Sequence, residues 1–151
     1  MDKTFLIHQL GAKLRPALQI AHAAAREAGE DARSGAARAV NMAKGQSARA
    51  AAAREALECL DLFRIRPLKR NEPICLGAVV DVEDEEGLGR TLFLAPVCGG
   101  EELTGPDGDG IFQVVTPTSP FGRAIMGKKA GQVIEVTISG ELTEWTITDV
   151  A

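Results

Sequence analysis

The beginning of the chain has apolar residues spaced alternately three and four positions apart, namely Ile7, Leu10, Leu14, Ala17, Ala21, Ala24 and Ala28. This spacing is typical of a helix that packs lengthwise against a partner helix. Pro16 interrupts the pattern, and proline usually bends or ends a helix. We therefore expect a short first helix, a break at Arg15–Pro16, and a continuation to Ala28 that ends at Gly29.

A second helix is expected over residues 36 to 63. One side of it carries the apolar positions Val40, Ala43, Ala50, Ala53, Leu57 and Leu60, and the other faces carry Arg38, Lys44, Arg49 and Arg54. A link of about seven residues makes the two helices antiparallel neighbours. Alanine side chains are small, so the helix axes can approach to the short end of the usual ~8–10 Å range. Residues 1–73 are therefore predicted to form a narrow antiparallel hairpin.

From Pro73 onward the helical spacing gives way to short segments rich in β-branched residues. Five such segments are ICLGAVVDVE, RTLFLAPV, IFQVVT, QVIEVTI and EWTITDV, and the links between them are rich in Gly, Asp and Glu. In the link TSPFGRAIMGKKAG, Ser119 can cap a short helix, Pro120 fits its first position, and Gly127 can end it. Residues 74–151 are therefore predicted to form an antiparallel sheet with one short helix, which makes the chain α+β.

Charge divides the chain at the same place. Residues 1–73 hold 13 Lys/Arg and 8 Asp/Glu, a net of +5, whereas residues 74–151 hold 4 and 13, a net of −9. We interpret this as two domains with different roles, 1–73 and 74–151. No apolar run approaches the ~18 residues that cross a membrane, no signal peptide is visible, and the three cysteines are widely spaced. These features predict a cytoplasmic protein without a membrane partner; they leave the oligomeric state open.

Several candidate sites fail on their spacing. GPDGDG lacks the third ligand and distal Glu of a calcium loop, and GLGRTL lacks the third glycine and the helix of a dinucleotide site. His8 and His22 lie far from any cysteine or acidic cluster. We therefore expect no tightly bound cofactor.

The segment SPFGRAIMGKKAGQVIEV, residues 119–136, resembles a Ser-Pro-x-x-Arg-Ala-x-x-Gly-Lys run in the C-terminal domain of the bacterial Gre transcript-cleavage factors, GreA and GreB. LFLAPVCGGE and QVVTPTSP are also similar to that family. In the first half, Arg15–Pro16, Ala25–Gly29 and Gly45 resemble Gre residues at the same spacing. The resemblance implies a coiled-coil hairpin followed by an FKBP-like β-rich domain.

The same resemblance implies a partner. Gre factors bind RNA polymerase: their hairpin enters the secondary channel while their C-terminal domain docks at its rim. Ser119 and Pro120 look like part of that docking surface, and Thr118 stands where relatives often have Asp.

The turn between the helices, EAGEDARSGAARA (residues 27–39), decides the expected activity. Active Gre factors resemble Gly-Asp-x-x-Glu-Asn here, and the two acids help to hold Mg²⁺ for cutting backtracked RNA within the polymerase complex. Aligned without a gap, Glu30 takes the first acidic position and Arg33 the second. Shifting by one residue places Asp31 and Ser34 there instead, so either alignment leaves one carboxylate.

Arg33 would also oppose a metal ion directly. A guanidinium ~5 Å from a divalent cation repels it by on the order of several kcal/mol. We therefore expect an accessory regulator of transcription, not itself an enzyme, with weak or no stimulation of cleavage. Arg33, Arg38 and Lys44 could face nascent RNA or acidic groups of the channel.

Two other functions stay open. The chain could be an active cleavage factor in which the adjacent Glu30 and Asp31 hold Mg²⁺ together at the tip. It could also be an FKBP-like prolyl isomerase, since a fold does not fix a function. Such isomerases line their pocket with several aromatic residues, and the second half of this chain has only Phe93, Phe112, Phe121 and Trp145.

Overall fold

The computed structural model describes residues 3–32 and 37–151, and its contacts divide the chain into two units. The hairpin unit is His8–Phe63, and the sheet unit joins Met1–Ile7 to Arg64–Ala151. The domain boundary after residue 73, drawn from composition, stays a prediction. The start of the chain thus groups with the sheet unit, although it is continuous with the first helix.

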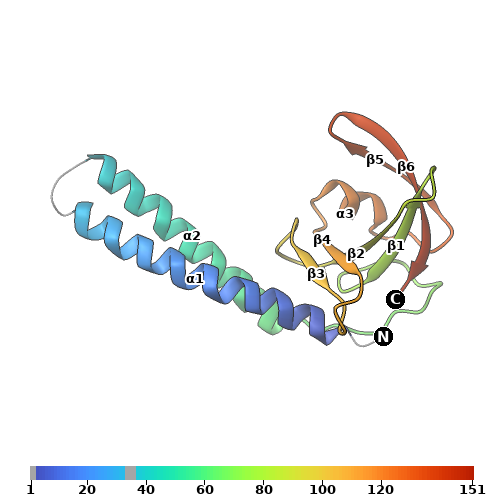
Figure 1. Cartoon of the computed structure of the whole chain (residues 1–151), viewed down its shortest axis with the longest axis horizontal. Helices are drawn as coiled ribbons and strands as arrows, with labels where there is room; N and C mark the ends of the chain where they lie inside the picture. Colours follow the sequence, from blue (N-terminus) through green and yellow to red (C-terminus); the bar gives the residue numbers. More distant parts are fainter. Residues whose placement is uncertain (1–2, 33–36) are drawn as a thin grey trace. The chain divides into compact units, whose positions relative to one another are not determined.

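Two helices, α1 (Thr4–Ala32) and α2 (Ala37–Leu62), run side by side in opposite directions (Figure 1). The first residues of α1 belong to the sheet unit, and the rest of α1 forms the hairpin unit together with α2. The expected second helix, 36 to 63, agrees with α2. One contact between the helices is a hydrogen bond from Arg54 Nη2 to His22 Nε2, 3.2 Å long. The alternating three-and-four spacing therefore identified the hairpin.

The expected bounds of the first helix were wrong, because α1 contains Pro16 and continues past Gly29 to Ala32. An interior proline costs about 3 kcal/mol and an interior glycine about 1 kcal/mol relative to alanine. The residues around both positions are mostly alanine and other strong helix formers. Each penalty is local, whereas helix propagation and packing act along the whole of α1.

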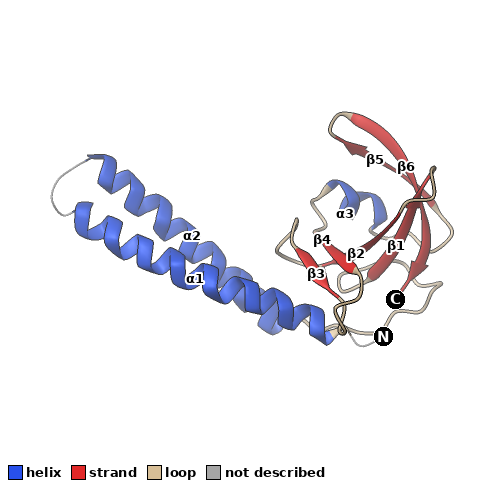
Figure 2. Cartoon of the chain, in the orientation of Figure 1, coloured by secondary structure: helices blue, strands red, loops and turns tan. Residues whose placement is uncertain are grey.

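The sheet unit contains β1 (Val79–Asp84), β2 (Gly89–Leu94), β3 (Glu102–Thr104), β4 (Ile111–Val115), β5 (Val133–Ile138) and β6 (Glu141–Val150). Among the described residues they form one sheet in the order β3-β4-β2-β1-β6-β5 (Figure 2). The short helix α3 (Pro120–Ile125) packs against β5. The α+β class is confirmed.

The sheet is mixed, not purely antiparallel as expected. β2 and β4 are parallel, with Thr91 opposite Phe112 and Leu94 opposite Val115. The cause is β3, which was missed because its three residues lie in a Gly- and acid-rich link. The chain leaves β2, forms β3 at the edge of the sheet, and returns through β4 in the direction of β2.

A buried apolar cluster lies between α3 and the sheet. The strands contribute Val80, Val82, Leu92, Leu94, Ile134, Val136, Trp145 and Ile147, and α3 contributes Phe121 and Ile125. In β5 the buried residues alternate with exposed ones, whereas in β2 three consecutive residues are buried. Burial of one such side chain stabilises a fold by about 1.5–3 kcal/mol. This cluster fixes α3, and with it the turn before α3, on the sheet.

The first residues of α1 are also anchored in the sheet unit. The side chain of Lys3 is 2% exposed, and its Nζ donates a 3.0 Å hydrogen bond to the backbone oxygen of Ala151. The rings of Phe5 and Phe112 meet edge to face, with centroids 6.0 Å apart. Burial lowers the pKa of Lys3, although the nearby Cys75 acts to raise it.

Candidate functional site

The predicted tip falls at the limit of the described structure. Glu30 and Asp31 belong to the last turn of α1 by their backbone, so they are helical and not part of the turn expected from the sequence. Their side chains, that of Arg38, and the whole of Arg33 lie outside the described residues. The metal-binding and RNA-facing roles of these residues therefore stay predictions.

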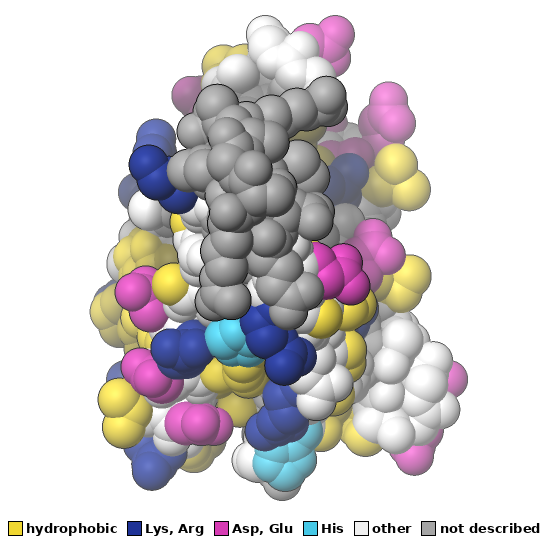
Figure 3. All heavy atoms as spheres, turned by 90° about the vertical axis from the view of Figure 1, so that its left-hand side faces the viewer, with side chains coloured by type: hydrophobic (Ala, Val, Ile, Leu, Met, Phe, Trp, Pro, Cys, Tyr) yellow, Lys and Arg dark blue, Asp and Glu magenta, His cyan; other side chains and the backbone are white. Residues whose placement is uncertain are grey.

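The described part of the hairpin carries a basic surface. Figure 3 shows Lys and Arg side chains gathered next to His side chains. Lys44 is exposed on α2, as an RNA-facing residue needs to be. Arg54 and His22 border a shallow hollow of about 220 Å³ with Ser47, Ala50 and Ala51. The charged side chains of Lys44 and Arg54 attract phosphate or carboxylate groups.

The predicted docking residues surround the start of α3. Ser119 caps the helix: its Oγ accepts a 3.1 Å hydrogen bond from the backbone N–H of Gly122 and donates a 2.7 Å bond to the backbone oxygen of Thr116. Pro120 takes the first helical position, and Gly127, with φ of 77°, follows the last turn. These local predictions are confirmed. Thr118 and Pro120 are exposed, so both side chains are available to a partner.

The turn that carries these residues is tightly packed. A Cβ atom added to Gly122 would overlap the backbone oxygen of Thr116. Only glycine therefore allows α3 to begin so close to the chain that enters it. Together with the two hydrogen bonds of Ser119, this close approach holds Thr118 and Pro120 in one conformation.

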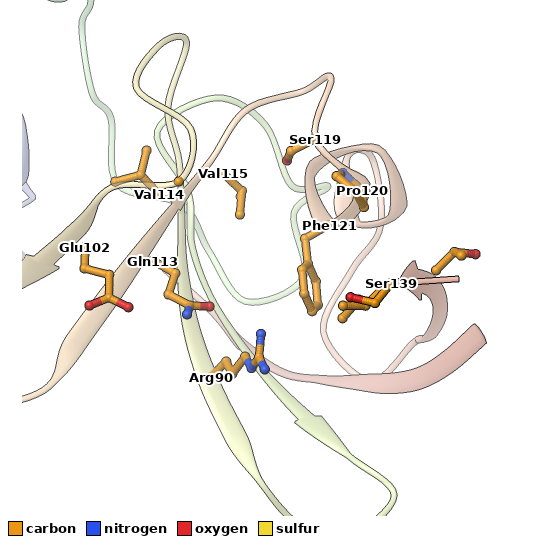
Figure 4. Close-up of a pocket in the computed structure, with 12 residues that line it drawn as sticks. Arg90, Glu102, Gln113, Val114, Val115, Ser119, Pro120, Phe121 and Ser139 are labelled. Atoms are coloured by element: carbon orange, nitrogen blue, oxygen red, sulfur yellow. The ribbon is translucent and has the colours of Figure 1, made fainter. Parts of the chain in front are cut away.

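A cavity of about 370 Å³ lies beside the predicted docking residues (Figure 4). It is bordered by Ser119, Pro120 and Phe121 from the start of α3, and by Gly100, Glu102, Gln113, Val114 and Val115 from β3, β4 and the link before β3. Thr137, Ile138 and Ser139 at the end of β5, and Arg90 on β2, complete its lining. The volume is within the usual ~300–1,000 Å³ of binding pockets.

Arg90 has an unusual environment in this cavity. Its guanidinium carbon lies 5.2 Å from the centroid of the Trp145 ring and 5.9 Å from that of Phe121. The rings contact each other edge to face, with centroids 5.3 Å apart, and Trp145 Nε1 donates a 2.9 Å bond to Thr143 Oγ1. Two fixed rings thus hold the cation by cation–π attraction.

Sequence reasoning missed this constellation. Arg90 was considered only as part of GLGRTL, and no motif connects it to Phe121 or Trp145. The three residues meet because β2 and β6 are both neighbours of β1, while α3 packs on the sheet near them. The amino-acid sequence contains no pattern that predicts this contact between distant segments.

The described residues lack two other kinds of feature. They contain no group of three or more His, Cys, Asp or Glu placed to hold a metal ion. None of their helices is both long enough and apolar enough to span a membrane.

Comparison with known proteins gives the family. A family model described as "Transcription elongation factor, GreA/GreB, C-term" matches residues 69–151, more than half of the chain. Among solved structures, GreA factor homologue 1 (Gfh1) of Thermus thermophilus is 19% identical, with a TM-score of 0.41 over 96% of this chain and 92% of that chain.

Two other solved structures have similar scores. A structure of the transcription factor Gfh1 is 24% identical, with a TM-score of 0.44 over 95% of this chain and 90% of that one. An elongation factor GreA/GreB from Nitrosomonas europaea is 14% identical, with a TM-score of 0.39 over 66% and 78%. A search of curated proteins gave no match. The assignment rests on the family model, and the chain belongs to the GreA/GreB family of transcription elongation factors.

Proposed function

We propose that this protein binds bacterial RNA polymerase and regulates transcription from the secondary channel, with weak or no stimulation of transcript cleavage. The observation that carries the proposal is the family match over residues 69–151, which includes the whole docking turn and the cavity beside it. The protein would act as an accessory factor through the active site of the polymerase, and not as an enzyme itself. Such a partner implies a cytoplasmic location.

The sheet unit supplies the docking surface. Thr118 and Pro120 are exposed on a turn that Gly122 and Ser119 keep rigid. A rigid, preformed surface loses little conformational entropy on binding, which favours affinity. The hydroxyl of Ser119 is occupied within the turn, so we assign it a positioning role, with the contacts to the channel rim made by its two neighbours.

The hairpin supplies the part that enters the channel. A helix of 26 residues such as α2 is about 40 Å long, at about 1.5 Å per residue. That length allows the tip to reach deep into a channel while the sheet unit stays at the rim. Lys44 on α2, together with Arg33 and Arg38, would contact phosphates of nascent RNA or acidic groups of the channel wall.

The tip residues determine what happens at the polymerase active site. Mg²⁺ prefers oxygen ligands, which Glu30 and Asp31 could supply within the complex. Arg33 occupies the second acidic position in the gapless alignment, where its charge would oppose a bound cation. Glu30 is also one carbon longer than the Asp it replaces, and a misplacement of ~1 Å can cost about 100-fold in rate.

The test uses backtracked elongation complexes with Mg²⁺, in which both polymerase binding and RNA shortening are measured. We expect binding with little or no increase in shortening. Absence of binding would refute the proposal, and binding with rapid shortening would refute its second part.

The alternative, an active cleavage factor, is favoured by one observation, the adjacent carboxylates Glu30 and Asp31. The substitution Arg33→Glu separates the two functions. It should create cleavage activity, on the order of tenfold or more, if the second acid is what the tip lacks. If the unmodified chain already cleaves, then Glu30→Gln with Asp31→Asn should abolish that activity.

The prolyl isomerase function has less support. Phe121 is the one aromatic residue among those that border the cavity. The ring of Trp145 lies beneath the Arg90 guanidinium, which places a charge where an isomerase needs an apolar floor. Turnover of a proline peptide would contradict this ranking.

A further inference from the structure

Arg90 is a cation without an acidic partner in a strongly acidic part of the chain. Residues 74–151 contain 13 Asp and Glu against 4 Lys and Arg. Among the described residues, no carboxylate lies within ion-pair distance of Arg90, whose charge contacts are the rings of Phe121 and Trp145. With so many carboxylates in the unit, the absence of a partner makes this guanidinium available to an external group.

The aromatic rings make Arg90 a prepared binding group. An arginine that contacts an aromatic face still has N–H donors at its edge, which suit the two oxygens of a carboxylate. The rings already restrict the side chain, so a ligand would not have to order it. Figure 4 shows the guanidinium directed into the cavity, between Gln113 and Phe121.

The rest of the lining suits an acidic residue with an apolar neighbour. The amide of Gln113 and the hydroxyls of Thr137 and Ser139 can donate further hydrogen bonds. Val114, Val115, Phe121 and Ile138 offer apolar contact. The one acidic group that borders the cavity, Glu102, lies on the other side of Gln113 from Arg90 in Figure 4, where it would repel an incoming carboxylate.

We propose that this cavity receives an acidic side chain of the polymerase, with its carboxylate bound by Arg90, and that Glu102 limits the affinity. The proposal rests on the proposed function, because Ser119 and Pro120 border the same cavity and belong to the docking turn. Arg90 is then a residue that selects the docking partner by charge. It lies outside the tip and plays no part in the chemistry there.

The experiment measures the affinity of the full chain for RNA polymerase core enzyme in variants that remove or keep single charges. Arg90→Gln should weaken binding about tenfold, because it removes a charge-assisted contact. Arg90→Lys should restore part of the loss, since it keeps the charge without the planar fork. Glu102→Gln should tighten binding by about two- to threefold, because the repulsion disappears.

Two matched control variants each remove one charge, positive or negative, at a position away from the cavity. Lys129→Gln and Glu141→Gln change exposed residues that do not border the cavity, and both should leave the affinity within about twofold. Trp145 is the single tryptophan, so its emission shows whether the ring beneath residue 90 keeps its environment in each variant. Added salt should weaken polymerase binding by the unmodified chain more than it weakens binding by the Arg90→Gln variant.

The directions in which Arg90→Gln and Glu102→Gln change the affinity for polymerase test the proposal. Weaker binding by Arg90→Gln together with tighter binding by Glu102→Gln supports an acidic partner group. The reverse signs would indicate a basic group and overturn the proposal. If neither variant differs from the unmodified chain while Thr118→Tyr abolishes binding, docking avoids the cavity: this inference fails and the proposed function stands. If the unmodified chain does not bind polymerase, both fail.

Discussion

The hairpin unit and the sheet unit differ in how they are stabilised. Among the described side chains of the hairpin, the buried apolar ones are Leu10, Ala50 and Leu60, whereas the sheet unit has a continuous cluster to which β1, β2, β4, β5, β6 and α3 contribute. Small alanine side chains bury little area, so the helices of the hairpin depend largely on local hydrogen bonds. The sheet unit depends on contacts between distant residues. The proposed docking surface therefore lies on the more rigid unit, and the predicted tip on the less stable one.

This difference predicts opposite results for the same substitution in the two units. In the sheet unit, Gly122→Ala places a methyl group against the backbone oxygen of Thr116, so the turn must move. We expect a loss of more than about 3 kcal/mol in unfolding free energy. Urea unfolding followed by the emission of Trp145 measures it. An unchanged midpoint would show that the turn is not as tight as the structure indicates.

The hairpin can be weakened by itself at Leu60, whose side chain is 3% exposed. Leu60→Ala should cost about 2–3 kcal/mol, the lower part of the range for such changes, because the alanine-rich helices of the hairpin bury few large side chains. Far-UV circular dichroism, which follows helix content, should shift to lower urea concentration. The transition reported by Trp145 should move less. Equal shifts of both signals would mean that the two units unfold as one.

Lys3 provides a pH test of the contact between the start of α1 and the sheet unit. Burial lowers the pKa of Lys3 in the folded state below the usual value for lysine, so between the folded and unfolded pKa values the unfolded chain binds more protons. Stability should therefore rise with pH in that window, by no more than about 1.4 kcal/mol per pH unit.

The matched variant for this test is Lys3→Met, which keeps an unbranched side chain, one atom shorter, and removes the charge. As pH rises toward 10.5, the usual pKa of lysine, the unfolding free energy of the unmodified chain should increase relative to that of Lys3→Met. A difference that is constant across this range would mean that Lys3 is not buried as a cation.

The smallest expected effect completes the comparison. Gly45 lies within α2, with no atom within 4 Å of an added Cβ. Gly45→Ala should stabilise the hairpin by about 0.5–1 kcal/mol, because alanine loses less conformational entropy in a helix. The same chemical change would thus destabilise one unit at Gly122 and stabilise the other at Gly45. Destabilisation by Gly45→Ala would reveal a contact that the structure does not show.

Sequence patterns predicted the structure where it is local. The hydrophobic spacing identified both helices, and Ser119, Pro120 and Gly127 identified α3, because a cap, a fixed φ and a left-handed glycine act over a few residues. The predictions failed where local preference was overruled: Pro16 and Gly29 lie inside α1, since their penalties are smaller than the gain from a continuous helix.

The features that the sequence did not predict depend on contacts between residues far apart in the chain. The parallel pairing of β2 with β4 follows from the position of β3, which has too few residues to show a pattern. The candidate site shows the same limit, since Thr118 and Pro120 were reached through a family motif, whereas Arg90 has meaning only beside Phe121 and Trp145. The roles of the tip residues Glu30, Asp31 and Arg33 stay predictions, which rest on the chemistry of their side chains alone.

The hydrogen bond from Lys3 to Ala151 joins residues 148 positions apart. A ribosome releases the first of them long before the second is made. The helices of the hairpin can form as soon as α2 has emerged, whereas the start of α1 must wait for β6 and the residue that follows it. During synthesis the hairpin would therefore exist before its anchor, and the ring of Phe5 would remain uncovered until β4, which carries its partner Phe112, has been made.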